Sequence, residues 1–217
     1  MKAMILAAGL GSRMRPLTEH TPKPLLEVGG KPLIVWHIER LKAAGFTQIV
    51  INVAYLGQQI IDYLGDGSQY GVSIVFSDEQ NEGALETAGG IIKALPLLSE
   101  TFLVVNGDIW TDYTFDNNFQ FSKNHVVKLI LVENPEHNLK GDFCLSDSEC
   151  KYTFSGIGYY SKEIFKELDY GKQALAPLLF NAIDRKVLTT ELYEGRWYDI
   201  GTPKRLEMLD NLLMSNV

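Results

Sequence analysis

The chain has 217 residues, of which 46% are hydrophobic and 22% are charged, and its formal net charge is -7. This composition excludes a disordered chain and can bury a large core, so we expect one domain spanning residues 1–217. The acidic balance argues against a nucleic-acid partner, two cysteines are too few for a disulfide scaffold, and no apolar run approaches the about 20 residues of a membrane helix. The sequence therefore predicts a cytoplasmic protein whose partners are small molecules.

The first half of the chain alternates strands with helices. Strands are predicted over residues 2–7, 48–54, 72–76 and 102–106, and helices over residues 32–44, 58–64 and 87–95. Gly45 is a plausible stop for the first helix, and Thr87 could cap the helix over residues 87–95. Strands that alternate with helices form a mostly parallel sheet covered on both faces.

The second half has a looser pattern that is compatible with antiparallel pairing. Strands are predicted over residues 126–132, 141–145, 152–160, 187–192 and 197–200, and helices over residues 162–168 and 175–184. A last helix follows Thr202 as its N-cap and Pro203 in its first turn. The expected fold is a single Rossmann-like α/β domain with a mixed, mostly parallel central sheet flanked by helices.

Residues 4–18 join a buried strand to a glycine loop and then to fixed cations. Gly9 and Gly11 allow main-chain N–H groups to approach a bulky anion, and the Arg13 guanidinium suits a phosphate. A dinucleotide-binding fingerprint would need a third glycine where Met14 stands, and the P-loop pattern is absent. A tight turn with solvated arginines would account for the loop taken alone.

Lys23 lies between Pro22 and Pro24, so its backbone is restricted to extended angles. This restriction presets the direction of the ammonium group. A rigid lysine suits charge stabilisation at a reacting phosphate, where pre-organised electrostatics supply most of the catalysis. A surface lysine in a proline-rich loop is the simpler explanation of the tripeptide by itself.

Two aspartates lie at the ends of predicted strands. Asp108 comes just after the strand 102–106, and Asp199 lies in the strand 197–200, shortly before the last helix. In open α/β sheets, ligands bind in the crevice at the carboxyl ends of strands. Mg²⁺ is commonly held by one or two carboxylates together with substrate phosphates and waters. Asp108 and Asp199 are therefore the candidate metal ligands, although either alone could be a turn or capping residue.

These motifs occur in the order found in the sugar-1-phosphate nucleotidyltransferases, which the chain resembles over nearly its whole length. The residues that carry this resemblance are Gly9-Leu-Gly-Ser-Arg13, Pro16-Leu-Thr18, Pro22-Lys-Pro24, Asn106-Gly-Asp108 and Trp197-Tyr-Asp-Ile-Gly-Thr202. Further segments, at residues 85–90, 105–113, 134–137, 141–143 and 153–157, resemble uridylyltransferases of this family that serve bacterial cell-wall recycling. The resemblance implies the nucleotide-diphospho-sugar transferase fold and Mg²⁺-dependent transfer of a uridylyl group from UTP to a sugar 1-phosphate.

The resemblance also assigns roles to residues. It implies catalytic roles for Arg13, Lys23, Asp108 and Asp199, with Mg²⁺ held by the two aspartates. It implies that the nucleotide is bound by Leu6, Ala8, Gly9, Gly11, Ser12, Arg13, Lys23, Glu79, Glu86 and Thr87. It implies that the sugar phosphate is bound by Asn106, Asp142 and Gly156.

Two departures from the family pattern concern substrate recognition. No Glu-Lys-Pro follows the sugar-binding strand, so contacts from that element cannot be transferred, and the segment 78–84 is longer than its counterpart in the uridylyltransferases. Uracil N3–H needs an acceptor, which Glu79 or a nearby main-chain carbonyl could supply.

Three other functions stay open at this point. One is nucleotidyl transfer from UTP, dTTP, GTP or CTP to glucose 1-phosphate, mannose 1-phosphate or phosphocholine. Another is a catalytically silent protein that binds nucleotide sugars or regulates, against which the presence of Arg13, Lys23, Asp108 and Asp199 argues. The third, a dinucleotide-dependent oxidoreductase, lacks its third glycine.

Overall fold

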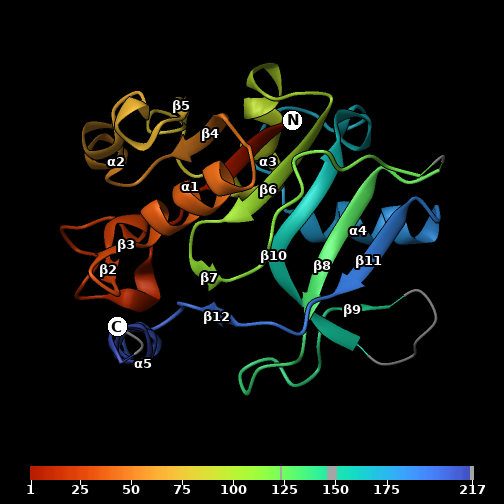
Figure 1. Ribbon diagram of the computed structural model, residues 1–217. Coiled ribbons are helices and arrows are strands. Elements are labelled where there is room, and N and C mark those ends of the chain that lie inside the picture. Colours follow the sequence, from red (N-terminus) through yellow and green to blue (C-terminus); the bar gives the residue numbers. More distant parts are fainter. Residues whose placement is uncertain (123, 146–150, 216–217) are drawn as a thin grey trace.

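The computed structural model describes residues 1–122, 124–145 and 151–215. An eight-stranded sheet forms its centre (Figure 1). The strands of this sheet are β1 (Lys2–Leu6), β4 (Gln48–Val53), β5 (Ser73–Asp78), β6 (Thr101–Asn106), β8 (Val127–Val132), β9 (Phe143–Cys144), β10 (Lys151–Ser161) and β11 (Leu188–Leu192). Two short ribbons stand apart from it, β2 (Glu27–Val28) with β3 (Lys31–Pro32), and β7 (Ile109–Thr111) with β12 (Trp197–Asp199).

Five α-helices are found in the described part of the chain. They are α1 (Leu33–Ala43), α2 (Gly57–Leu64), α3 (Glu86–Ala94), α4 (Leu175–Asp184) and α5 (Pro203–Met214). None of these helices has the length and apolar character that crossing a membrane requires.

The sheet is mixed and mostly parallel, which confirms the expected fold class. Its strand order is β11-β8-β10-β6-β1-β4-β5, and β9 pairs with β10. Strands β6, β1, β4 and β5 are parallel neighbours, whereas β10 runs antiparallel to both β6 and β8. The chain passes from β1 to β4 and β5 on one side and then returns to β6 on the other. The carboxyl ends of β1 and β6 therefore meet at a switch point, where α/β sheets bind ligands.

Alternating side chains of β1 enter two different cores. Ala3 and Ile5 belong to the cluster that includes residues of α1 and α2. Met4 belongs to the cluster that includes residues of α3 and α4. Because successive strand residues point to opposite faces, each face of the sheet is covered by its own helices.

A third apolar cluster supports the glycine loop and α5. Its buried members are Met14, Leu26, Val28, Leu33, Trp110, Ile200 and Leu209. Figure 1 shows α5, with the C-terminus, near the β2–β3 ribbon, and the two elements are in contact. Met14, the residue that replaces the third glycine of a dinucleotide loop, is fully buried in this cluster. The replacement therefore anchors the loop to the core.

Most predicted elements are confirmed, but several local details differ. The helix expected over 162–168 is a 3-10 turn, η5 (Lys162–Phe165), followed by bonds of the same short period, from Lys166 N to Glu163 O and from Leu168 N to Phe165 O. The strand expected over 141–145 has only two residues, and β2, β3 and β7 were not predicted. Strands of two or three residues are too short to show a period.

Candidate active site

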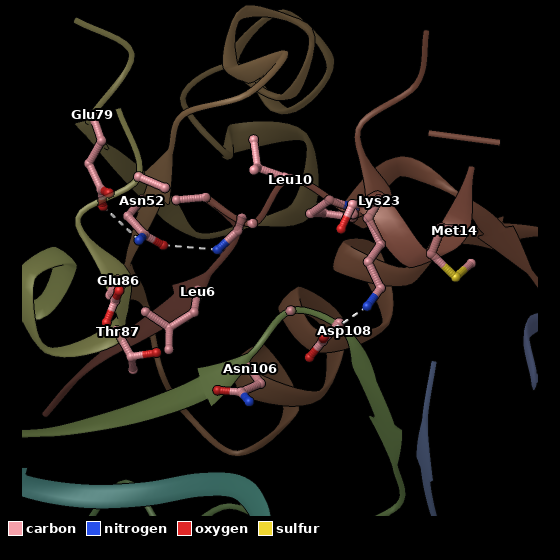
Figure 2. Close-up of a pocket in the computed structure, with 18 of the residues that line it drawn as sticks. Leu6, Leu10, Met14, Lys23, Asn52, Glu79, Glu86, Thr87, Asn106 and Asp108 are labelled. Atoms are coloured by element: carbon pink, nitrogen blue, oxygen red, sulfur yellow. Dashed lines mark hydrogen bonds and ion pairs between the residues drawn. The ribbon is translucent and has the colours of Figure 1, made fainter. Parts of the chain in front are cut away.

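A cavity of about 490 Å³ lies at the carboxyl ends of β1 and β6, next to the glycine loop (Figure 2). Twelve of the predicted site residues line it, namely Leu6, Ala8, Gly9, Gly11, Ser12, Arg13, Lys23, Glu79, Glu86, Thr87, Asn106 and Asp108. Asp199, Asp142 and Gly156 are not among the lining residues. The switch point of the sheet thus brings together residues that are about 100 positions apart in the chain.

The two loop glycines play different parts. Gly11 adopts a left-handed φ of +62°, and a Cβ there would lie 3.0 Å from Thr18 Cγ2. The Thr18 hydroxyl donates to the Gly11 carbonyl at 2.7 Å, which holds the loop closed. Among the described residues, apart from the chain neighbours of Gly9, no atom lies within 4 Å of the position that a Cβ on Gly9 would take. Gly11 therefore shapes the loop, whereas Gly9 leaves open space for a ligand beside the main chain.

Lys23 and Asp108 face each other across the cavity wall (Figure 2). Lys23 Nζ lies 2.8 Å from Asp108 Oδ2, and the lysine side chain is only 10% exposed. Gly107 permits this arrangement, because its N–H donates to Leu6 O at 2.9 Å and a Cβ there would come within 2.6 Å of the same oxygen. The end of β6 can therefore close on the end of β1 and carry Asp108 to the glycine loop.

The β7–β12 ribbon places Asp199 beside Asp108. Asp199 pairs with Ile109 in the ribbon, and Ile200 N donates to Asp108 O at 2.9 Å. Asp199 Oδ2 accepts a hydrogen bond from Arg205 Nη1 and lies 3.0 Å from His137 Nε2. The two aspartates predicted as metal ligands are therefore neighbours.

A charged clamp fixes this ribbon. Asp112 accepts bonds from Arg196 N at 2.8 Å and Arg196 Nε at 2.9 Å, and also from the Tyr193 hydroxyl. Burial by itself would raise the pKa of Asp112, but the hydrogen bonds from Tyr193 and Arg196 outweigh it and lower the pKa. Arg196 also lies over the ring of buried Trp110. These contacts hold β12 against β7 and so fix the position of Asp199.

The carboxylate oxygens of Asp108 and Asp199 are suitable ligands for a hard divalent cation. Each carboxylate has one oxygen, Oδ2, paired with a cationic side chain, while no hydrogen-bond partner of either Oδ1 is found in the described part of the chain. That part also contains no group of three or more His, Cys, Asp or Glu side chains that could hold a metal ion. Two carboxylates fit an ion whose remaining ligands are phosphate oxygens and waters.

Buried polar groups connect β1 to the start of α3 on the other side of the cavity (Figure 2). Ala7 N donates to Asn52 Oδ1 at 2.9 Å, Asn52 Nδ2 donates to Glu79 Oε1 at 2.8 Å, and Leu85 N donates to Glu79 Oε2 at 3.0 Å. Asn52 and Glu79 are both buried. Sequence reasoning did not single out Asn52, although a lone amide within the apolar run of β4 was a usable signal.

The start of α3 differs from the expectation. Thr87 does not cap the helix, because the N-cap position is Leu85 and carries no side-chain hydrogen bond. Instead Gln173 O accepts the N–H of Gly89 at 3.1 Å. Glu86 has a left-handed φ of +61°. Its Oε1 lies 3.6 Å from Nζ of Lys172, which also lines the cavity and was not indicated by the sequence. Such strain in a residue other than glycine costs about 1–3 kcal/mol and is typical of ligand sites.

The residues predicted to bind the sugar phosphate divide into two groups. Gly156 has φ +81° at an irregularity of β10, and a Cβ there would lie 2.7 Å from Asn106 Cγ, so these two residues are in contact. Asp142 instead accepts from Phe154 N at 2.9 Å and from Asn138 Nδ2 at 3.1 Å. Asp142 thus braces the β9–β10 region, away from the cavity lining.

Comparison with known proteins agrees with this geometry. Residues 2–141 match the family described as nucleotidyl transferase. The chain is 54% identical to N-acetylmuramate alpha-1-phosphate uridylyltransferase of Neisseria meningitidis serogroup B, over 95% of this chain and 96% of that protein. It superposes with a TM-score of 0.75 and 25% identity on the CTP:phosphocholine cytidylyltransferase of Streptococcus pneumoniae, covering 98% of both chains. A Bacillus anthracis protein described as a glucose-1-phosphate thymidylyltransferase, 24% identical with a TM-score of 0.84 over 99% of this chain and 95% of that one, has the same fold.

Proposed function

The chain belongs to the nucleotidyl transferase family, and from that premise we propose that it transfers a uridylyl group from UTP to N-acetylmuramate 1-phosphate. The products are UDP-N-acetylmuramate and pyrophosphate. The observation that carries the proposal is the placement of Lys23, Asp108 and Asp199 beside a glycine loop, in a chain that matches the Neisseria enzyme over nearly its full length. With UTP as the donor we assign the reaction to the cytoplasm, and the product would fit cell-wall recycling.

In the proposed reaction an oxygen of the sugar phosphate attacks the α-phosphorus of UTP. A new P–O bond forms, the bond from the α-phosphorus to the bridging oxygen breaks, and that oxygen leaves with its electron pair as pyrophosphate. The attacking phosphate is already anionic, so no strong general base is needed. The remaining obstacles are charge repulsion and misalignment, which fixed cations and positioning overcome.

The residues that would bind the triphosphate and the metal have different roles. The β- and γ-phosphates would be held by main-chain N–H groups of the glycine loop together with the side chains of Ser12 and Arg13. All of these residues line the cavity. Lys23 would neutralise charge at the α-phosphate. We infer that the family's divalent metal is Mg²⁺ here, held by Asp108 and Asp199, and that it supplies further charge neutralisation at the reacting phosphates.

The two ends of the cavity would bind the two substrates. In Figure 2, Glu79, Glu86 and Thr87 lie on one side, opposite Lys23 and Asp108. We assign the first side to the nucleoside. Both oxygens of Glu79 are oriented by the bonds from Asn52 and Leu85, and each oxygen keeps a second lone pair that could accept uracil N3–H.

The acceptor sugar has a separate surface. Asn106 lines the cavity next to Asp108 and contacts Gly156, so these two residues would bind the sugar phosphate. Asp142 would act from the second layer, because its oxygens hold the backbone of β10 in place.

A substrate screen tests the proposal. UTP, dTTP, CTP, GTP and ATP are each combined with N-acetylmuramate 1-phosphate, glucose 1-phosphate, mannose 1-phosphate and phosphocholine, and pyrophosphate release is measured. We expect the highest kcat/KM for UTP with N-acetylmuramate 1-phosphate. If another pair gave the highest kcat/KM, the proposed substrates would be wrong but the proposed reaction type, nucleotidyl transfer, would stand. No release with any pair would contradict an enzyme and favour a protein that only binds nucleotide sugars.

A further inference from the structure

Arg205, in the first turn of α5, is held by one end of its guanidinium. Its Nη1 donates to Asp199 Oδ2 and lies 3.2 Å from His137 Nε2. No hydrogen bond from Nε or Nη2 to any described residue is found. These two nitrogens form the side-on edge of the guanidinium, whose parallel N–H groups match the two oxygens of a carboxylate. Asp199 thus orients Arg205 and leaves its bidentate edge available.

This edge lies behind the cavity lining at Gly201, and Arg205 itself is not a lining residue. Gly201 lines the cavity, and a Cβ on it would lie 3.1 Å from Arg205 Nη2 and 3.2 Å from Asp199 Oδ1. Nη2 of Arg205 and Oδ1 of Asp199, one of the two candidate metal ligands, therefore both lie next to Gly201. A substrate whose phosphate is held by Asp199 and its metal would extend past this edge.

The position of Arg205 in its helix is unfavourable for stability. The first turn of α5 contains the cations Lys204 and Arg205 and no acidic residue. A helix N-terminus carries partial positive charge and disfavours cations. Lys204 is exposed to solvent, whereas Arg205 is partly buried against Asp199. Of these two cations, Arg205 is therefore the one whose side chain is held in a defined position, by Asp199.

The other cations around the cavity already have assignments. Lys23 pairs with Asp108 and would meet the α-phosphate, and Arg13 belongs to the glycine loop. Lys172 pairs with Glu86 on the nucleoside side. Among the described residues around the cavity, Arg205 is the remaining cation on the acceptor side. None of the reacting phosphates is assigned to it.

We propose that the Nε and Nη2 edge of Arg205 binds the carboxylate of the lactyl group on the acceptor, and thereby selects N-acetylmuramate 1-phosphate over neutral sugar 1-phosphates. This inference rests on the proposed function. N-acetylmuramate differs from N-acetylglucosamine by a lactyl ether on O3, so it carries a second anion on the same ring as its 1-phosphate. Asp199 holds Nη1 on one side of the guanidinium, and the substrate carboxylate binds the opposite side.

The test compares two acceptors in matched variants. N-acetylmuramate 1-phosphate and N-acetylglucosamine 1-phosphate share the sugar ring and phosphate but differ in the carboxylate. We expect Arg205→Met to lower kcat/KM for the first acceptor about 10- to 100-fold more than for the second, mainly through KM, as expected for a lost charge-assisted bidentate contact. Arg205→Lys keeps the charge without the planar edge and should recover only part of the selectivity. Lys204→Met, in the same helical turn, should leave the ratio unchanged.

A binding measurement separates recognition from catalysis. Affinities for UDP-N-acetylmuramate and UDP-N-acetylglucosamine are measured by calorimetry without Mg²⁺. We expect the wild type to prefer the acidic product and Arg205→Met to lose this preference. An unchanged preference, or an equal loss for both products and both acceptors, would overturn the proposal and leave Arg205 as a residue that only positions Asp199. A wild type that turns over neither acceptor with UTP would refute the proposed function instead, while the binding ratio would still test Arg205.

Discussion

Replacing Asp199 or Asp108 by asparagine is expected to lower Mg²⁺-dependent turnover roughly a thousandfold, because a metal site contributes several kcal/mol of transition-state stabilisation. Asparagine keeps the size and one oxygen but removes the charge that a hard cation requires. The fold should persist, since Asp108 is 39% exposed and the ribbon that carries Asp199 is held by the Asp112 clamp.

Metal binding and turnover are measured separately for these variants. Pyrophosphate release is followed as Mg²⁺ is varied, and Mn²⁺ bound in the presence of UTP is counted by electron paramagnetic resonance. Asp184→Asn, at the exposed end of α4, is the matched control and should behave as wild type in both measurements. Wild-type turnover in both Asp108→Asn and Asp199→Asn, or unchanged Mn²⁺ affinity, would refute the metal assignment.

Lys23→Ala is expected to reduce kcat by about 10²- to 10³-fold, the effect of removing one pre-organised charge from the transition state. The Kd for UTP should rise much less, because in the proposed complex the glycine loop would still hold the β- and γ-phosphates. The stability cost should be small, since the Asp108 carboxylate that loses its partner is partly solvated.

Lys31→Ala provides the control for Lys23. Lys31 is another lysine close in sequence to the glycine loop, but it pairs with exposed Glu39 and does not line the cavity. Stopped-flow measurement of a single turnover and calorimetric titration with UTP give the two effects independently. If kcat of Lys23→Ala equals that of the wild type, or if only UTP binding weakens, Lys23 has no part in the chemical step.

The sequence predicted the parts of the site that depend on local backbone. Gly9 and Gly11 follow a strand, and Asp108 follows another, so the rule for carboxyl ends of parallel strands was enough to bring them together. The expected extended backbone of Lys23 was wrong, because Lys23 is the first residue of a 3-10 turn, η2 (Lys23–Leu25), closed by bonds from Leu25 N to Pro22 O and from Leu26 N to Lys23 O. Its side chain is nevertheless largely buried, with the ammonium on Asp108. The mostly parallel sheet was predicted from a different feature, the alternation of strands with helices in the first half of the chain.

Contacts between segments that are distant in the chain could not be predicted from the sequence. His137 and Arg205 meet at Asp199 although 68 positions separate them, and Asn52 reaches Glu79 from a different strand. Such pairs depend on the arrangement of loops on the sheet, which periodicity does not encode. Thr87 failed as a cap for a similar reason, since a main-chain carbonyl from the segment before α4 took that place.

In the proposed reaction, this site joins the α-phosphate of UTP to the phosphate of N-acetylmuramate 1-phosphate. The most direct test incubates the protein and Mg²⁺ with that acceptor and UTP radiolabelled on either its α- or its γ-phosphorus, followed by separation of the products. We expect the α-label to be recovered in UDP-N-acetylmuramate and the γ-label in pyrophosphate. Recovery of the γ-label on the sugar, or of the α-label only in UMP or unreacted UTP, would contradict it.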